Sequence, residues 1–227
     1  ANLNVRVEVI NAGIAAANSL PETYYIKNTL IDYEPDLFII YDGWNDSRFH
    51  GLDPETKNKV VHLFGFMRSY HSWRTPFVVA HLIDLTYSEQ RDYVQNMTIN
   101  DEIMDKAIFT WESRWIEVCE LGKKEGYRTL IAIQPILGTG NKTLSPDESM
   151  LFPNTEYEAG ILKMLNGLTQ SFELENTCEK TVDLRNIFDN ISEPVYYDKG
   201  HLSDFGNEIV AQKLFELSLP LVVEKPS

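Results

Sequence analysis

The sequence predicts an α/β fold in which a parallel sheet is covered by helices on both faces. Short apolar or β-branched runs alternate with longer helical stretches along the 227 residues, and this alternation is typical of parallel sheets. Two of the runs are continuously apolar and bounded by turn residues, which indicates strands buried on both faces. Because 43% of the residues are hydrophobic, we expect one core and a single domain over residues 1–227.

The first strand is predicted by alternating β-branched residues, and the first helix by residues that are typical of helix ends. Residues 5–10 read Val-Arg-Val-Glu-Val-Ile, an alternating β-branched run that predicts a strand. Ser19 precedes Glu22 by three positions, the capping-box pattern of a helix start. This helix is expected to end before Pro35, because a proline disfavours helical geometry at the residue before it. A buried strand is expected at 36–41.

Residues 52–127 are expected to be helical, since they show no strand pattern. One buried helix face is predicted there by four apolar residues spaced by three, four and three positions: Ile108, Trp111, Trp115 and Val118. Gly126 follows a basic pair and is expected to end this helix. The segment at about 47–127 therefore forms a helical insertion between two strands. Because long connections lie above the site in such folds, it is the expected source of substrate specificity.

The second half of the chain completes the alternation of strands and helices. A buried strand is expected at 129–134, where a proline follows it, and a loop rich in Gly, Pro, Ser and Asn at 138–155. A helix is expected at about 156–174 and a short strand at 181–184. The last helix is expected at about 203–217.

Composition and motifs argue against several kinds of partner. A net charge of −14 would repel a phosphate backbone, so no nucleic acid partner is expected. No apolar run approaches the roughly 18 residues that a membrane-spanning helix needs. The stretch 138–143 departs from the phosphate-loop pattern at Asn141, so it is interpreted as a loop beside the site. No metal is expected, since four histidines lack metal-ligand spacing: His50, His62, His71 and His81.

The two cysteines and the first residue bear on the cellular context. Cys119 and Cys178 are too few for a disulfide framework, and Cys119, within the helical stripe, is expected to be a small buried hydrophobe. Neither cysteine fixes the compartment. The chain starts at Ala1 with neither an initiator methionine nor a signal peptide, so we expect the natural protein to extend upstream. An upstream signal or anchor would place it outside the cytoplasm.

Two loops expected at the carboxyl ends of strands contain groups that can stabilise negative charge. Gly13 follows the first strand, either as an ordinary turn residue or as a backbone N–H that binds an oxyanion. Gly43, Trp44, Asn45 and Asp46 follow the second strand. These residues favour a turn for local reasons, but the Asn45 amide is also a neutral donor that needs no charge partner in a dry site.

A third loop, before the last helix, contains Asp198 and His201. A histidine near a helix start is often a cap or a surface residue. Alternatively, a tight turn brings the Asp198 carboxylate to the imidazole, fixes its tautomer and leaves the other ring nitrogen as a general base.

Together, the strand-end Gly, the Gly-x-Asn-Asp turn and the Asp-x-x-His turn resemble the SGNH (GDSL-type) ester hydrolases, in order and spacing across nearly the whole chain. The resemblance implies a flavodoxin-like, three-layer α/β/α sandwich without metal or cofactor. It also implies that Gly13 and Asn45 form the oxyanion hole. His201 would be the general base, and Asp198 would orient it.

The family's nucleophilic serine block, typically Gly-Asp-Ser, precedes the glycine block, so the resemblance places it upstream of Ala1. Ser19 is explained as a helix cap, Ser47 follows the Asn45 turn, and no Gly-x-Ser-x-Gly elbow occurs. In the family's sheet, the strand with this block lies between the strands expected at 5–10 and 36–41. The domain is therefore expected to be incomplete at its N-terminus.

The expected activity is serine-dependent hydrolysis of a carboxylic ester, of the esterase, lipase or deacetylase type. The expected partner is a small-molecule ester, such as an acylated carbohydrate or lipid. Trp44 and Trp73 are weaker candidates for substrate binding, on a sugar or along an acyl chain. An O-acyltransferase stays open if the site excludes water. A non-catalytic carbohydrate- or protein-binding domain also stays open: the missing serine favours it, and the oriented base disfavours it.

Overall fold

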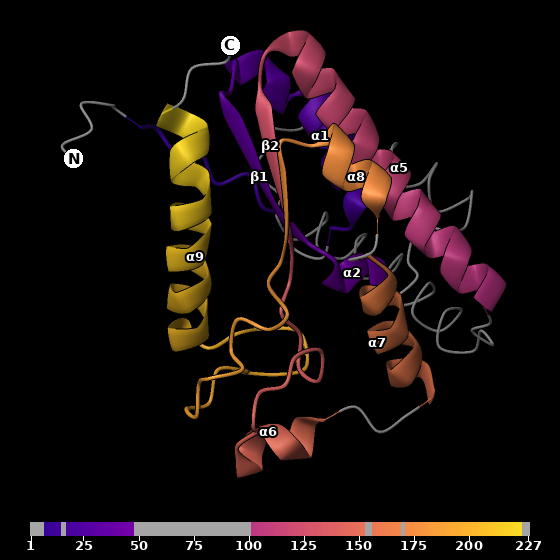
Figure 1. The fold of residues 1–227 in the computed structure, drawn as a ribbon, viewed down its shortest axis with the longest axis vertical. Coiled ribbons are helices and arrows are strands. Elements are labelled where there is room, and N and C mark those ends of the chain that lie inside the picture. Colours follow the sequence, from indigo (N-terminus) through magenta and orange to yellow (C-terminus); the bar gives the residue numbers. More distant parts are fainter. Residues whose placement is uncertain (1–6, 15–16, 48–100, 153–155, 169–170, 224–227) are drawn as a thin grey trace, which may run out of the picture.

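A parallel β-sheet with helices on both faces forms the centre of the structure (Figure 1). The computed structural model describes residues 7–14, 17–47, 101–152, 156–168 and 171–223. The strands, in spatial order, are β1 (Leu37–Asp42), β2 (Arg128–Ile133) and β3 (Lys180–Asp183), and neighbours are parallel. The predicted α/β class with a parallel sheet is confirmed.

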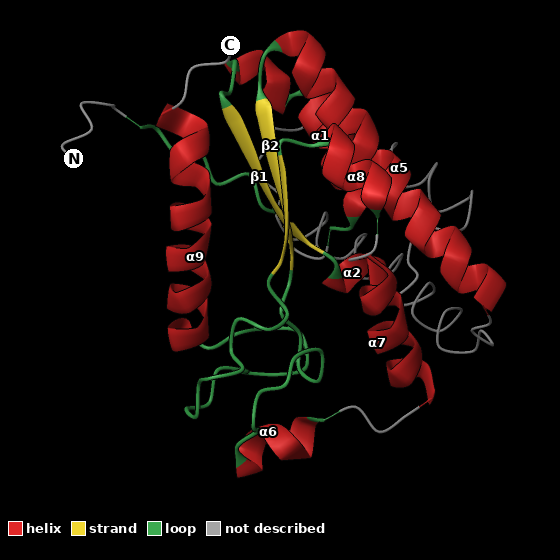
Figure 2. Cartoon of the chain, in the orientation of Figure 1, coloured by secondary structure: helices red, strands yellow, loops and turns green. Residues whose placement is uncertain are grey.

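Helices form an outer layer on each side of this sheet (Figure 2). They are α1 (Ser19–Asn28), the 3-10 helix η1 (Leu30–Tyr33), α2 (Trp44–Ser47), α5 (Asp101–Glu125), α6 (Pro146–Leu151), α7 (Glu156–Leu168), α8 (Phe172–Thr177) and α9 (Asp204–Val223). Helix α9 lies on one side of the sheet, and α1, α5 and α8 lie on the other (Figure 1). The three-layer arrangement follows, because strands buried on both faces need a helix layer on each.

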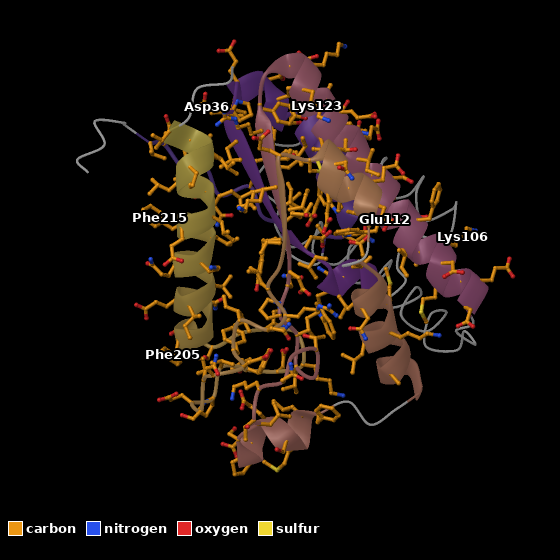
Figure 3. All side chains as sticks on the ribbon, in the orientation of Figure 1. Asp36, Lys106, Glu112, Lys123, Phe205 and Phe215 are labelled. Atoms are coloured by element: carbon orange, nitrogen blue, oxygen red, sulfur yellow. A yellow bond between two sulfur atoms is a disulfide. The ribbon has the colours of Figure 1, made fainter. Side chains whose placement is uncertain are left out.

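The carboxyl ends of the strands share one end of the structure. Asp36, directly before β1, lies at the opposite end from Phe205, in the first turn of α9 (Figure 3). The loops that follow the strands gather at the Phe205 end (Figure 2). Ligands of open parallel sheets bind at this end, and the candidate site lies there.

The central strand β2 has the most apolar surroundings. Leu130 and Ile131 are buried, and they pair in register with Ile39 and Ile40 of β1. The strands predicted at 36–41, 129–134 and 181–184 are confirmed, each shifted by one residue.

The strand predicted at residues 5–10 is wrong for the part that the structure describes. Residues 7–10 have no regular structure, and Val9 is 86% exposed. Within the described ranges, no strand pairs with the outer edge of β1, where Ile39 is 44% exposed. Alternating β-branched residues form a strand only where a neighbouring strand supplies ladder hydrogen bonds and packing. The described residues supply neither to 7–10.

The N-terminal helix is shorter than predicted. Helix α1 ends at Asn28, a 3-10 turn continues to Tyr33, and Glu34 adopts a left-handed conformation with φ of 50°. The N-cap is Asn18, whose side chain accepts a hydrogen bond from the Leu20 N–H. The prediction of Ser19 as the cap is therefore wrong by one residue.

Helix α5 forms the core on its side of the sheet. Trp111, Trp115 and Val118 are completely buried, which confirms the predicted apolar face. Gly126 ends the helix with φ of +91°, a conformation that favours glycine. The remainder of the predicted insertion, residues 48–100 with Trp73, lies outside the described residues.

Helix boundaries in the second half differ from the prediction in three places. The region 138–155, predicted as a loop, contains α6, which begins with a complete capping box between Ser145 and Glu148. The helix predicted at 156–174 is two helices, α7 and α8. The last helix runs to Val223, six residues beyond the predicted end at Leu217.

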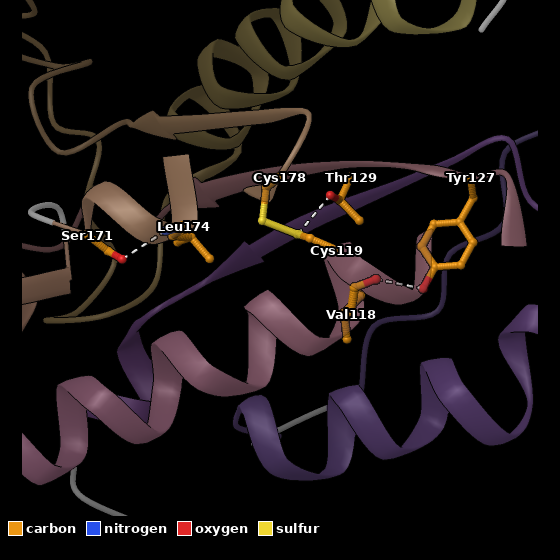
Figure 4. The surroundings of a disulfide bond; sticks show 7 residues. All are labelled: Val118, Cys119, Tyr127, Thr129, Ser171, Leu174 and Cys178. Carbon is orange, nitrogen blue, oxygen red and sulfur yellow. Dashed lines mark hydrogen bonds between the residues drawn. A yellow bond between two sulfur atoms is a disulfide. The ribbon is translucent and has the colours of Figure 1, made fainter. Parts of the chain in front are cut away.

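A disulfide joins Cys119 of α5 to Cys178, the residue after α8 (Figure 4). Both side chains are buried, and the Cα atoms lie 5.0 Å apart. The predicted burial of Cys119 is confirmed, but the cysteine is not a free hydrophobe. The two cysteines lie 59 positions apart in the sequence, and only the packing of α8 against α5 brings them together. The bond holds these helices on one face of the sheet.

Removing the disulfide is expected to lower the free energy of unfolding by about 2–4 kcal/mol, since the cross-link restricts the unfolded chain. Urea unfolding of the Cys119→Ala/Cys178→Ala variant measures this loss. Reduced wild-type protein is the control and should unfold at the same urea concentration as the variant. Equal stability of oxidised and reduced wild type would contradict the prediction.

Candidate active site

The candidate site is built on three loops, each of which follows one strand of the sheet. Helix α2 follows β1 directly, Gln134 follows β2, and a long segment at 184–203 connects β3 to α9. The Trp44 N–H donates to the Gln134 side-chain oxygen at 3.0 Å, so the first two loops are joined at the ends of their strands.

The structure brings Asp198 and His201 into direct contact, as the sequence predicts. The imidazole Nδ1 lies 2.8 Å and 3.0 Å from the two oxygens of the Asp198 carboxylate. One of these oxygens also accepts hydrogen bonds from the backbone N–H groups of Gly200 and His201, both at 2.8 Å. A carboxylate bonded to Nδ1 places the proton there and leaves Nε2 as the basic nitrogen.

Electrostatics keep this carboxylate ionised. Partial burial raises the pKa of Asp198, but hydrogen bonds from the Gly200 N–H, the His201 ring and the His201 N–H outweigh burial and leave the pKa below its ordinary value. The His201 side chain is 71% exposed. Its imidazole is therefore oriented by Asp198 and open to a substrate.

A short hairpin presents this turn. Tyr196 and Leu202 form an antiparallel bridge, the Tyr197 N–H donates to the His201 carbonyl, and the Ser203 N–H donates to the Val195 carbonyl. Tyr196 points inward and its ring packs edge-on against Phe188. The turn at 198–201 therefore projects from a hairpin that is fixed to the core.

Glu148 anchors the first strand of this hairpin, and sequence reasoning did not identify it as a site residue. Its side chain is 1% exposed. Oε1 accepts hydrogen bonds from the Val195 and Tyr196 N–H groups at 2.9 Å and 3.2 Å. Oε2 accepts from the Ser145 N–H and the Lys142 ammonium, both at 2.9 Å. The pattern Ser-x-x-Glu at 145–148 is a sequence signal for the cap, but not for the contact with the hairpin.

Four donors on one carboxylate change its titration. Burial raises the pKa of Glu148, but the hydrogen bonds from Ser145, Val195, Lys142 and Tyr196 outweigh it and lower the pKa to about 2. The group is a permanent anion that ties α6 to the hairpin of His201.

Trp44 connects the Asn45 turn to the His201 turn. A Cβ atom on Gly200 would lie 2.4 Å from the Trp44 indole, so the ring packs directly against the backbone of Gly200. The preceding residue, Gly43, has φ of +131°, a conformation that L side chains rarely adopt. Trp44 was predicted as a substrate contact. The structure places its ring against Gly200 in the Asp198–His201 turn, which limits where that turn can lie.

Asn45 and Gly13, the two residues predicted to form the oxyanion hole, both donate hydrogen bonds within the protein. The Asn45 amide donates to the Ala17 carbonyl at 2.6 Å, which ties the Asn45 turn to the segment before α1. A side-chain amide has a second N–H, and that donor is the one available to an oxyanion. Gly13 is exposed, and its N–H donates to the Asn11 side chain at 3.0 Å.

A buried polar network lies beside Asn45. Asp46 accepts hydrogen bonds from the Ser19 N–H at 2.7 Å and the Ser19 hydroxyl at 2.5 Å, and the Arg114 guanidinium lies 3.6 Å away. Burial and the nearby Asp42 charge raise the pKa of Asp46. Asp42 in turn accepts a hydrogen bond from the Trp111 indole N–H at 2.9 Å. This network fixes α2, and it uses Ser19 as a structural donor.

The described residues form an α/β protein with a three-stranded parallel sheet flanked by helices, and this fold matches that of a solved esterase structure. A similar structure is the crystal structure of the acetyl xylan esterase AlAXEase, with a TM-score of 0.53 and 18% sequence identity. The match covers 93% of this chain and 81% of that chain. No protein-family model and no curated protein sequence matches the chain. At 18% identity, the likeness concerns the fold alone.

Two further observations concern membranes and metals. No helix in the described part of the chain is both long and apolar enough to cross a membrane. Within the same part, no three His, Cys, Asp or Glu side chains are grouped as metal ligands.

Proposed function

We propose that the protein hydrolyses carboxylic esters through a Ser-His-Asp triad in which His201 is the general base and Asp198 orients it. The observation that supports this most is the 2.8 Å contact between Asp198 and the Nδ1 atom of His201, whose side chain is exposed. The Trp44 ring packs against Gly200 in the same turn and so connects it to the Asn45 turn. A binding domain has no need for an oriented base. The fold of an SGNH-type esterase is consistent with the same chemistry.

The remaining roles follow from the chemistry of acyl transfer. Nε2 of His201 takes the proton of the serine hydroxyl as the serine attacks the ester carbonyl, and later returns it to the leaving alcohol. The second N–H of Asn45 and the N–H of Gly13 donate to the developing oxyanion. Gly13 can take this role once the Asn11 side chain releases its N–H, because the two acceptors compete for one donor.

The nucleophile in this proposal is a serine on a segment upstream of Ala1, in a strand that pairs with the outer edge of β1. That edge has no strand beside it within the described residues, and Ile39 on β1 is 44% exposed. Ser19 and Ser47 do not suit the role, because both are completely buried. Their hydroxyls donate to Asp46 and to the Trp44 carbonyl.

A fluorophosphonate probe tests this proposal, since it reacts covalently with an activated serine. The protein is expressed from its whole gene. We expect one labelled serine, upstream of Ala1, and labelling that is lost when the protein is unfolded in urea. Folded protein that takes no label would overturn the proposal and favour a binding domain on the same scaffold. A label on a serine downstream of Ala1 would overturn the upstream position alone.

A further inference from the structure

The segment that follows β2 contacts both of the turns from which the candidate site is built. Its first residue, Gln134, accepts the Trp44 N–H through its side-chain oxygen at 3.0 Å, at the start of α2. Three residues later, the Leu137 N–H donates to the Lys199 carbonyl at 3.2 Å, within the turn at 198–201. The central strand of the sheet therefore ends in a segment that is bonded to each turn by a separate group.

This segment is fixed to the sheet and to the core. The Gln134 N–H donates to the Asp42 carbonyl at 3.0 Å, which continues the ladder between β1 and β2. The Thr139 hydroxyl accepts the Ile136 N–H at 3.1 Å and donates to the Ile136 carbonyl at 2.6 Å. Leu137 is completely buried. The Gln134 side chain therefore extends from a backbone whose position relative to β1 is set.

Helix α2 depends on an acceptor from outside its own segment. It has four residues, and the Ser47 N–H donates to the Gly43 carbonyl at 2.9 Å. The first N–H groups of a helix have no partner within it, and a single turn is marginally stable by itself. The Trp44 N–H is the first of these groups in α2. Gln134, 90 positions further along the chain, supplies its acceptor.

The direction of the Asn45 side chain depends on where α2 begins, because Asn45 is the second residue of this helix. One N–H of its amide donates to the Ala17 carbonyl at 2.6 Å. The hydrogen bond from the Trp44 N–H to Gln134 fixes the backbone directly before Asn45. Together, the two contacts determine where the second N–H of the amide points. A displacement of about 1 Å at a reacting group can cost about 100-fold in rate.

On the basis of the proposed function, we infer that Gln134 is a positioning residue, which directs the second N–H of Asn45 toward the carbonyl oxygen of the ester. It acts through the Trp44 N–H and touches no reacting atom. The His201 turn does not need this side chain, since the Leu137 backbone bonds it to the same segment. The effect of Gln134 on the reaction is therefore exerted through Asn45.

Replacing Gln134 with leucine tests this inference, because leucine has a similar size and no acceptor. On ethyl acetate, with protein expressed from its whole gene, we expect kcat to fall about tenfold to 100-fold. KM should stay within about twofold, since the donor acts mainly in the transition state. Gln134→Glu should restore most of kcat, because its carboxylate also accepts the Trp44 N–H. Gln212→Leu, on the exposed surface of α9, is the matched control and should leave kcat unchanged.

A double-mutant cycle separates positioning of Asn45 from a general loss of structure. In the Asn45→Ala background, Gln134→Leu should cost less than about threefold in kcat, because the donor that it orients is already absent. The full loss in that background would overturn the inference, and so would a Gln134→Glu variant as slow as Gln134→Leu. Circular dichroism and the urea midpoint report folding. If Gln134→Leu does not fold, Gln134→Asn, which withdraws the acceptor by one methylene, takes its place in the cycle.

Nuclear magnetic resonance gives a readout that does not depend on hydrolysis. In protein labelled with ¹⁵N, the side-chain NH₂ resonances of Asn45 should shift in Gln134→Leu and return toward their wild-type positions in Gln134→Glu. Unchanged Asn45 resonances in Gln134→Leu would overturn the inference even in an active esterase. Wild type that hydrolyses no ester but shows these shifts would overturn the proposed function and still support the orientation of Asn45 by Gln134.

Discussion

Replacing His201 with alanine is expected to reduce kcat about 10⁴-fold or more, because the serine then lacks both its base and the acid for the leaving alcohol. Asp198→Asn should cost about 10⁴-fold as well. The amide cannot hold the Nδ1 proton as the carboxylate does at 2.8 Å, and it does not stabilise an imidazolium. The kinetics are measured on an acetate ester with the protein expressed from its whole gene.

Asp204→Asn is the matched control for Asp198→Asn, since Asp204 is an exposed carboxylate in the first turn of α9. It should leave kcat unchanged. Circular dichroism and the urea midpoint of each variant report whether the fold is retained. Full activity in folded His201→Ala would remove this residue from the mechanism, and with it the proposed triad.

The contact between Asp198 and His201 was predictable because its geometry is local. Three positions separate Asp198 from His201, and a tight turn at that spacing can bring carboxylate and imidazole together, as the structure shows. The strands β1 and β2 were predictable for a related reason, since continuous apolar runs in an α/β chain have few alternatives to a buried strand.

The predictions that failed depend on long-range contacts. Ser19 and Ser145 begin the same Ser-x-x-Glu pattern, but only Ser145 forms a capping box. Asp46, 27 positions away, accepts both donors of Ser19, so the cap moves to Asn18. No local pattern contains that information.

The disulfide and the position of Trp44 also depend on long-range contacts. The disulfide of Cys119 and Cys178 depends on how α8 packs against α5. The contact of Trp44 with Gly200 depends on how two loops meet at the end of the sheet. Sequence spacing therefore predicted the contact between Asp198 and His201, and the tertiary packing determines what holds their turn in place.

Glu148→Gln is expected to lower the free energy of unfolding by about 3 kcal/mol at neutral pH, because removing one charge of a buried, hydrogen-bonded ion pair such as Glu148–Lys142 costs about this much. Both oxygens accept hydrogen bonds from N–H donors. An amide would turn an NH₂ group toward one pair of those donors and leave buried polar groups unsatisfied. The hairpin that holds His201 should then loosen, so kcat should fall as well. Urea unfolding and initial-rate kinetics measure the two effects.

The pH dependence separates this ionic anchor from a general packing defect. The pKa of Glu148 is about 2 in the folded protein and 4.5 in its ordinary state, so the unfolded chain binds the proton first as the pH falls. The stabilisation is present above about pH 4.5 and is lost as the pH falls toward 2. Wild type should therefore lose its advantage over Glu148→Gln across that range, whereas Glu208→Gln, a change on the exposed surface of α9, should follow wild type throughout. A stability difference that stays constant from pH 7 to pH 2.5 would contradict an ionic role, because only a charge that titrates in this range can produce the convergence.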